Sequence, residues 1–227
     1  METKYPEIIS IDGNIGSGKS TFLDYLIEYF KDDPTVVILK EPVDKWSALM
    51  DPDTNMSLLE SYYGNPITFA FPFQMYVLQT LIEAINQVYL NHPQCQTIIC
   101  ERSIASSRDV FARMLHSHEI MNPLEYQVYL NAFSMIPHIE QYMPSKIFYL
   151  SLSAYDCHER VQIRNRQGEE DITMDYLEEC EKYFERWLHE ITIPIKIYDL
   201  SPSAEGAPQC KEQIKKSFID FWKELKE

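Results

Sequence analysis

A glycine-rich segment near the start of the chain has the residue types that hold phosphate groups. Residues 13–20 read Gly-Asn-Ile-Gly-Ser-Gly-Lys-Ser, which satisfies GxxxxGK[ST], and they stand between a short apolar run and a helical pattern. The glycines let successive backbone N–H groups converge on phosphates, Lys19 adds a point charge, and the Ser20 hydroxyl can ligate Mg²⁺. We therefore predict a P-loop at 13–20 that binds a nucleoside triphosphate.

Two acidic residues follow other apolar runs. Glu41 comes after 35–40 and Glu101 after 96–100. In open α/β sheets, ligands bind at the carboxyl ends of the strands, so both carboxylates are expected beside the P-loop. Glu41 could accept a proton from an attacking hydroxyl. Glu101 could hold Mg²⁺ directly or through water, while Arg102 could reach both the acceptor hydroxyl and Glu41.

Three arginines are concentrated at 160–166 in a chain that is short of positive charge. Arg160 and Arg164 are four residues apart on one helix face, and Arg166 follows them. Such a cluster favours a lid at about 160–172 that closes over a triphosphate and stabilises its oxygens. The alternative is a solvated helix whose arginines pair with the acidic residues at 169–171.

The elements that position these residues alternate between short β-branched runs and longer helical patterns, which is typical of βαβ units. We predict an α/β fold of the P-loop NTPase type, with three layers and a five-stranded parallel sheet flanked by helices. Strands are expected at 7–12, 35–40, 96–100, 146–152 and 193–198. Helices are expected from Lys19 to the Asp33-Pro34 stop, at about 69–90 and near the C-terminus.

Helical periodicity indicates which side chains these helices bury. Listed by helix, the predicted stripes are Phe22, Leu23, Leu26, Ile27 and Phe30; Phe73, Val77, Leu81, Ile85 and Val88; and Ile214, Phe218, Phe221, Trp222 and Leu225.

Composition narrows the class of protein. The 227 residues suit one domain spanning 1–227, and the net charge of −15 argues against a nucleic acid polymer as partner. No apolar run is long enough to cross a membrane. The five cysteines are scattered without a CxxC pair, which favours reduced thiols and a cytoplasmic location. A GTPase would need an NKxD motif, and none is present, so a small P-loop kinase remains.

Together these motifs resemble those of the deoxyribonucleoside kinase family, which includes deoxycytidine, deoxyguanosine and mitochondrial thymidine kinases and an insect multisubstrate enzyme. The resemblance covers nearly the whole chain. It rests on GNIGSGKS at 13–20, EPVxxW at 41–46, FxFQxY at 71–76, ERS at 101–103, and RxxxRxR at 160–166 with the acid Glu169. It implies a homodimer that uses ATP and Mg²⁺ to phosphorylate the 5′-hydroxyl of deoxyribonucleosides, a step in nucleotide salvage.

The resemblance also implies roles for individual residues. Glu41, Arg102 and Lys19 would be catalytic, and Ser20 and Glu101 would bind the metal. Tyr63 and Glu169 match the pair that binds the 3′-hydroxyl, and Gln74 matches the amide that reads the base edge. The expected ATP-binding residues are Gly13, Asn14, Ile15, Gly16, Ser17, Gly18, Lys19, Ser20, Thr21, Arg160, Arg164 and Arg166. The expected substrate-binding residues are Glu41, Val43, Trp46, Leu59, Tyr62, Tyr63, Phe73, Gln74, Val77, Leu81, Arg102, Ser107, Phe111 and Glu169.

Departures from the family pattern indicate which nucleobase the pocket would accept. Members selective for deoxycytidine and purine deoxynucleosides have an Arg paired with an Asp where this chain has Leu81 and Ser107. In this pocket the chain resembles the insect multisubstrate kinase, and the space left by the missing pair could admit the thymine methyl. Tyr62 replaces a frequent Met and would narrow the pocket. We predict a preference for thymidine and deoxycytidine over purine nucleosides.

Two other functions are compatible with a P-loop. A thymidylate-type monophosphate kinase would need to hold an acceptor phosphate, but Glu41 stands where a cation would be expected. A regulatory subunit that binds nucleotide without turnover would not need Lys19, Glu41, Glu101 and Arg102 together.

Overall fold

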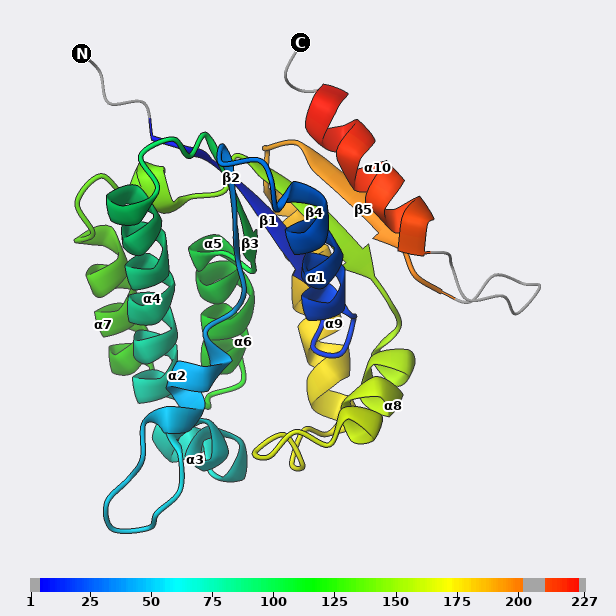
Figure 1. The fold of residues 1–227 in the computed structure, drawn as a ribbon. Helices are drawn as coiled ribbons and strands as arrows, with labels where there is room; N and C mark the ends of the chain where they lie inside the picture. Colours follow the sequence, from blue (N-terminus) through cyan, green and yellow to red (C-terminus); the bar gives the residue numbers. More distant parts are fainter. Residues whose placement is uncertain (1–4, 202–210, 225–227) are drawn as a thin grey trace.

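A parallel sheet organises the chain (Figure 1). The computed structural model describes residues 5–201 and 211–224. Within these ranges, the sheet contains β1 (Glu7–Gly13), β2 (Val36–Leu39), β3 (Thr97–Glu101), β4 (Lys146–Ser151) and β5 (Ile195–Asp199). The strand order is β2-β3-β1-β4-β5, and all neighbours are parallel. The predicted five-stranded parallel sheet is confirmed.

Helices cover both faces of the sheet. The described helices are α1 (Lys19–Phe30), α2 (Val43–Ala48), α3 (Leu58–Gly64), α4 (Pro66–Asn91), α5 (Ile104–Ser106), the π-helical segment η1 (Ser107–Ala112), α6 (Arg113–Ser117), α7 (Pro123–Ser134), the 3₁₀ turn η2 (Ile139–Tyr142), α8 (Ala154–Arg164), α9 (Met174–Glu190) and α10 (Lys211–Glu224).

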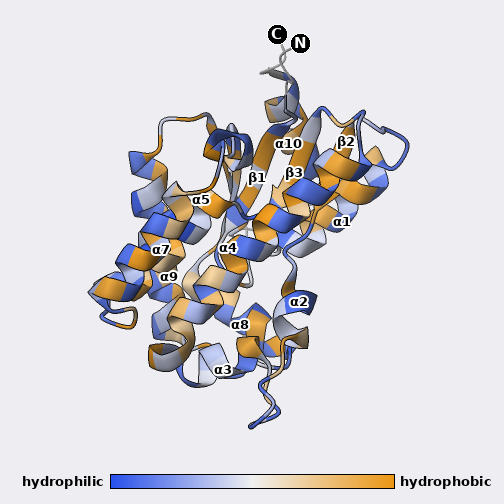
Figure 2. Cartoon of the chain, turned by 90° about the vertical axis from the view of Figure 1, so that its left-hand side faces the viewer, coloured by the Kyte–Doolittle hydropathy of each residue, from blue (hydrophilic) through white to orange (hydrophobic). Residues whose placement is uncertain are grey.

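Alternation along β1 explains the three layers. Ile9 and Ile11 are buried in a cluster with α1 and α10, whereas Ile8 joins the cluster on the opposite face with α4 and α7. Successive side chains of a strand point to opposite faces, so one strand serves two cores. In Figure 2, β1 and β3 are largely hydrophobic, while α1 and α4 carry hydrophobic and hydrophilic residues on different sides.

The first predicted stripe is wrong at one position. Phe22, Leu23, Leu26 and Phe30 are buried, but Ile27 is 43% exposed. A residue is displaced by 100° from its neighbour around a helix, so Ile27 lies beyond the buried edge that Leu23, Leu26 and Phe30 define. The buried stripe of α1 therefore consists of Phe22, Leu23, Leu26 and Phe30, and Ile27 lies outside it.

The long helix begins earlier than predicted. It starts at Pro66 rather than near Phe69, because Asn65 caps it by accepting the N–H of Thr68 and Pro66 suits the first turn. Its predicted stripe, Phe73, Val77, Leu81, Ile85 and Val88, is buried.

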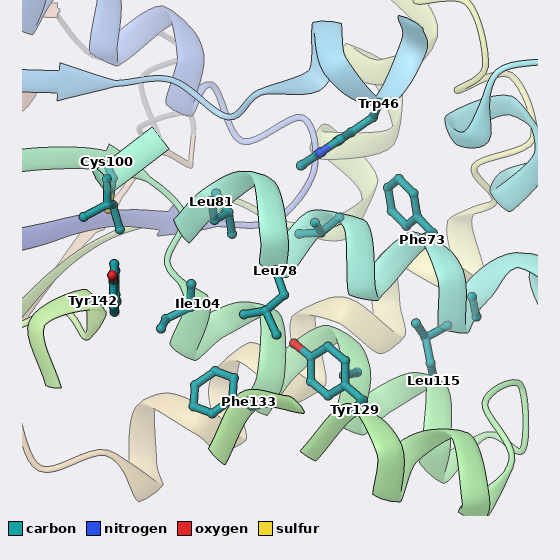
Figure 3. Close-up of a cluster of buried hydrophobic side chains, with 14 of the residues drawn as sticks. Trp46, Phe73, Leu78, Leu81, Cys100, Ile104, Leu115, Tyr129, Phe133 and Tyr142 are labelled. Carbon is teal, nitrogen blue, oxygen red and sulfur yellow. The ribbon is translucent and has the colours of Figure 1, made fainter. Parts of the chain in front are cut away.

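The α4 face of the sheet carries a large apolar core. Figure 3 shows Leu78 and Leu81 of α4 near Ile104, with Phe133 and Tyr129 of α7 below them. On the opposite face, Phe218 and Phe221 of α10 are buried as predicted, and Leu225 lies outside the described residues. These two cores hold the carboxyl ends of β1, β2 and β3 in fixed positions.

Candidate active site

The P-loop connects β1 to α1 and is tightly packed. Gly16 has φ +86°, and a Cβ at this position would lie 2.4 Å from the carbonyl oxygen of Cys157 on α8, so no other residue fits. The buried ammonium of Lys19 donates to the carbonyl oxygens of Gly13 at 3.1 Å and Asn14 at 2.8 Å. Burial, and to a lesser extent repulsion by Arg102, lowers the pKa of Lys19 to about 8.

Asn14 stabilises the P-loop through hydrogen bonds on the side away from the cavity. Its side-chain amide donates to the carbonyl oxygen of Leu177 on α9 at 2.8 Å, and its own oxygen accepts the N–H of Ile15 at 2.8 Å. Asn14 is buried, and neither it nor Gly13 lines the cavity described below. Of the predicted ATP-binding residues, these two therefore shape the loop rather than face its opening.

Glu41 and Arg102 form an ion pair at the ends of β2 and β3, in which Arg102 is buried and Glu41 is partly exposed. Arg102 Nε lies 3.0 Å from Glu41 Oε1. The guanidinium also lies over the ring of Phe111, 4.4 Å from the ring centroid, and its Nη1 is buried without a partner. Burial raises the pKa of Glu41, although Arg102 opposes the rise. A free guanidinium nitrogen beside a carboxylate suits binding and deprotonation of a hydroxyl.

Glu101 and Ser20 bring oxygen atoms together beside Lys19. Ser20 Oγ donates to Glu101 Oε1 at 2.7 Å, and the backbone N–H of Glu41 donates to Glu101 Oε2 at 3.5 Å. A hydroxyl and a carboxylate are the hard oxygen ligands that Mg²⁺ accepts together with waters and phosphate oxygens. In the part of the chain that the structure describes, no group of three or more His, Cys, Asp or Glu side chains could hold a metal by itself.

Aromatic side chains from α2, α3 and α4 form a pocket next to Glu41. Trp46 donates its indole N–H to Thr80 Oγ1 at 3.0 Å and meets Phe73 edge to face, with ring centroids 5.5 Å apart. The ring of Tyr62 stacks on Phe73 at 4.4 Å, and its hydroxyl is 3.0 Å from that of Tyr176. The flat, apolar walls suit a planar heterocycle.

The arginine-rich segment reaches across to both sides of the site. Arg160 donates to the carbonyl oxygen of Ser17 in the P-loop at 3.3 Å. Arg164 and Arg166 pair with the buried Glu169 at 2.5 Å and 3.1 Å. Glu169 is one of the acids that the solvated alternative named. Its carboxylate is buried, and all three arginines line the cavity.

The loop after Arg166 also contacts α3. Gln167 donates to Glu60 Oε1 at 2.7 Å, and a Cβ on Gly168 would lie 3.0 Å from Glu60 Cγ. Glu60 is itself held by its capping box with Ser57. The segment 160–172 therefore spans the distance from the P-loop to α3, as a lid would.

One cavity of about 990 Å³ unites these parts. Apart from Gly13 and Asn14, every predicted site residue lines it, including the predicted metal-binding residues Ser20 and Glu101. The cavity is also lined by residues that were not individually predicted as site residues, which are Phe22, Tyr25, Lys40, Asp44, Ser103, Leu150, Tyr176, Leu200 and Ile214. Tyr176 is the most informative of these, because its hydroxyl hydrogen-bonds that of Tyr62. It lies just after residues 160–172, where no motif marks it.

The P-loop, the parallel sheet and the acid at the end of β2 define a P-loop phosphotransferase. A model of the deoxynucleoside kinase family matches residues 9–224, and the chain belongs to that family. Deoxycytidine kinase 2 of Gallus gallus is 30% identical over 210 residues, which cover 85% of this chain and 77% of that protein.

Two human proteins are similarly related. Human deoxycytidine kinase is 30% identical over 207 residues, 82% of this chain and 76% of that protein. Human mitochondrial thymidine kinase 2 is 29% identical over 189 residues, 83% of this chain and 66% of that protein. Among the described residues, no helix combines the length and the apolar character needed to cross a membrane.

Proposed function

We propose that this deoxynucleoside kinase transfers the γ-phosphoryl group of ATP to the 5′-hydroxyl of pyrimidine deoxyribonucleosides in preference to purine ones. The observation that carries the proposal is the Glu41–Arg102 pair, which lines one cavity together with the P-loop and the aromatic pocket. A nucleoside whose base lies between Trp46, Phe73 and Phe111 would direct its sugar towards Glu41.

In this proposal Glu41 accepts the proton of the 5′-hydroxyl. The 5′-oxygen forms a bond to the γ-phosphorus while the bond to the β–γ bridging oxygen breaks, and ADP leaves. Arg102 holds Glu41 ionised and orients it, while Lys19 and the lid arginines stabilise the negative charge on the transferred group. Mg²⁺, held by Ser20 and Glu101, would neutralise phosphate charge when it is bound.

Two features support the preference for pyrimidines. Leu81 and Ser107 are buried and line the cavity, so the site carries no charged pair at these positions. The space beside them is where we propose that the 5-methyl of thymine lies. Tyr62, fixed by Phe73 and Tyr176, narrows the pocket against the larger purine bases.

Initial rates with thymidine, deoxycytidine, deoxyadenosine and deoxyguanosine, each with ATP and Mg²⁺, test the proposal. We expect the two pyrimidines to lead in kcat/KM. Purines in the lead would contradict the base preference. Phosphorylation of thymidylate instead of nucleosides would favour a monophosphate kinase. We do not expect this result, because the carboxylate of Glu41 would repel the phosphate group of a nucleotide acceptor.

Changing the base preference tests the pocket itself. Leu81→Arg with Ser107→Asp introduces the charged pair of the members selective for deoxycytidine and purine deoxynucleosides. It fills the space proposed for the thymine methyl, so we expect the kcat/KM ratio of purines to pyrimidines to rise by about tenfold. Unchanged relative kcat/KM values across the four deoxynucleosides would contradict this account of specificity.

The cytoplasmic location and the homodimer remain predictions. The four cysteines in the described part of the chain are free thiols. Helix α7 carries the large exposed apolar side chains of Leu124 and Val128, and Met135 at its C-cap is also exposed; a subunit interface on this face would bury them.

A further inference from the structure

A tight turn follows the last lid arginine and points at helix α3. The N–H of Glu169 donates to the carbonyl oxygen of Arg166 at 3.0 Å, so Gln167 and Gly168 form the tip of a four-residue turn. Gly168 is buried and has φ +87°, which glycine favours at the third position of such a turn. In Figure 1, the loop between α8 and α9 extends from α8 towards α3.

Glu60 of α3 holds the tip of this turn. Its Oε1 accepts the side-chain amide of Gln167 at 2.7 Å, and a Cβ on Gly168 would lie 3.0 Å from its Cγ. Its other oxygen, Oε2, accepts the N–H of Ser57 at 2.7 Å in the capping box of α3. The cap thus fixes the Glu60 side chain, so the contact with the turn orders little that is not already ordered.

This contact connects two parts of the cavity. Arg166 and Glu169, at the two ends of the turn, pair at 3.1 Å and both line the cavity. On α3, Tyr62 and Tyr63 line the same cavity, whereas Glu60 does not. Glu60 therefore joins the segment that carries the lid arginines to the helix that carries aromatic walls of the pocket.

We propose that Glu60 is a positioning residue that holds the turn at 166–169 against α3 and thereby couples the binding of the nucleoside to that of ATP. The inference rests on the proposed function, because it assigns the pocket beside Tyr62 and Tyr63 to the nucleoside and the lid arginines to the triphosphate. A nucleoside orders α3, and ATP orders the lid. Because Glu60 joins them, the ligand that binds second finds part of this ordering done and binds more tightly.

Calorimetric titration measures this coupling without turnover. The titrant is the β,γ-imido analogue of ATP with Mg²⁺. Its Kd is measured without nucleoside and with a saturating concentration of the deoxynucleoside that the unmodified enzyme phosphorylates best. In the unmodified enzyme we expect the nucleoside to lower this Kd by about fivefold or more, the lower end of ordinary coupling between two sites. In Gln167→Ala, which leaves the cap of α3 intact, the ratio of the two Kd values should fall towards one.

Substitutions at Glu60 test the same contact from the side of α3. Glu60→Ala should lower the ratio as Gln167→Ala does, and the double variant should lower it no further, because both changes remove one contact. Glu60→Gln should keep the ratio. Its oxygen can accept from Ser57, while its amino group donates to the side-chain oxygen of Gln167 after that amide turns over.

Glu125→Ala is the matched control for the loss of a helix cap. Glu125 has the same place in the capping box of α7, where its carboxylate accepts the N–H of Asn122 at 2.9 Å. This variant should leave the ratio unchanged. Thermal unfolding checks that each variant is folded.

A ratio of one or below in the unmodified enzyme would overturn the inference. So would a ratio that Gln167→Ala leaves unchanged, or one that Glu60→Gln loses as completely as Glu60→Ala does. In each of these cases the initial rates with the four deoxynucleosides decide the proposed function separately. If none of the four is phosphorylated, the proposed function fails, and this inference fails with it.

Discussion

Glu41 combines a mostly buried position with a cationic neighbour, and these two influences act in opposite directions. Burial raises its pKa, while Arg102 at 3.0 Å favours the carboxylate. A general base is most effective when its pKa is close to the working pH, so a pKa above the ordinary range of a glutamic acid suits the proposed role.

Removing the base should affect turnover far more than nucleotide binding. We expect Glu41→Gln to lower kcat by about 10²- to 10⁴-fold, the usual contribution of a general base, with the Kd for ATP unchanged. Steady-state kinetics and calorimetric titration with ATP measure the two effects. Glu83→Gln, at a half-exposed partner of Lys45, is the control. A Glu41→Gln enzyme as active as the parent would revive the regulatory-subunit alternative.

Lys19 should make ATP binding depend on pH. Its lowered pKa of about 8 means that the side chain loses its charge as the pH rises through 8, and the anionic triphosphate prefers the charged form. The Kd for ATP, measured from pH 6.5 to 9.5, should therefore increase above pH 8 by up to about tenfold per pH unit. In Lys19→Met the affinity should be low and independent of pH in this range. A flat profile in the parent would contradict the role of Lys19.

Residue types and spacing were enough to predict the P-loop, the carboxylates and the arginines of the cavity, whereas its aromatic pocket was predicted from the resemblance to the family. Lys19, Glu41 and Arg102 lie in short motifs next to elements that periodicity reveals. Asn14 and Tyr176 show the limit, because the partner of each is distant in sequence: Asn14 bonds Leu177, and Tyr176 bonds Tyr62. Local pattern carries no information on which residue of a far helix will meet a loop.

At the scale of elements, the P-loop depends on the start of α8. The Gly16 Cα lies so close to the Cys157 carbonyl that a methyl group would overlap it. We expect Gly16→Ala to raise the Kd for ATP by at least about tenfold and to lower the unfolding temperature by several degrees, since backbone must shift and φ is positive. Calorimetric titration and thermal unfolding report the two quantities.

Gly64→Ala is the matched control for this substitution. Gly64 ends α3, and the nearest atom to an added Cβ is Asp171 Oδ2 at 3.9 Å, an ordinary contact. ATP affinity and stability should be close to those of the parent. If Gly16→Ala behaved in the same way as Gly64→Ala, the close packing of the loop on α8 would not matter for nucleotide binding.

Element types could be predicted because strands and helices differ in period, but their ends and details depend on packing. The start of α4 at Pro66 follows from a cap by Asn65 that a stripe of apolar residues does not reveal. The exposure of Ile27 follows from its angular position, and the π-helical turn at Ser107 has no pattern of its own. Hydrophobic periodicity therefore predicted the sheet and the helices better than it predicted their boundaries.

At the scale of the whole molecule, the net charge of the chain is negative, whereas one cavity gathers many of its cationic side chains. The net charge is −15, yet Lys19, Arg102, Arg160, Arg164 and Arg166 all line one cavity. A phosphate polymer that runs along the surface meets repulsion, whereas a triphosphate that enters the cavity meets local cations. The distribution of charge therefore suits a small anionic ligand.

The exposed apolar face of α7 gives the homodimer a test. Sedimentation equilibrium should give twice the chain mass for the parent. Leu124→Glu with Val128→Glu should give a monomer, because charges would be buried at the interface. Ile27→Glu on α1 is the matched control, because Ile27 is 43% exposed and Val128 is 44% exposed. This variant should have the same mass in solution as the parent. A monomeric parent would contradict the prediction.

The order in which the strands join the sheet has a consequence for synthesis on the ribosome. β1 emerges first, but its neighbours are β3 and β4, whose first residues are Thr97 and Lys146. The glycine of the P-loop at 16 rests on Cys157, which emerges later still. One edge of β1 therefore lacks its β4 partner until Lys146 and the residues after it are synthesised, and the nucleotide site forms only after Cys157. Chaperones that recognise apolar segments would have their longest opportunity at the same strand that later carries the phosphate-binding loop.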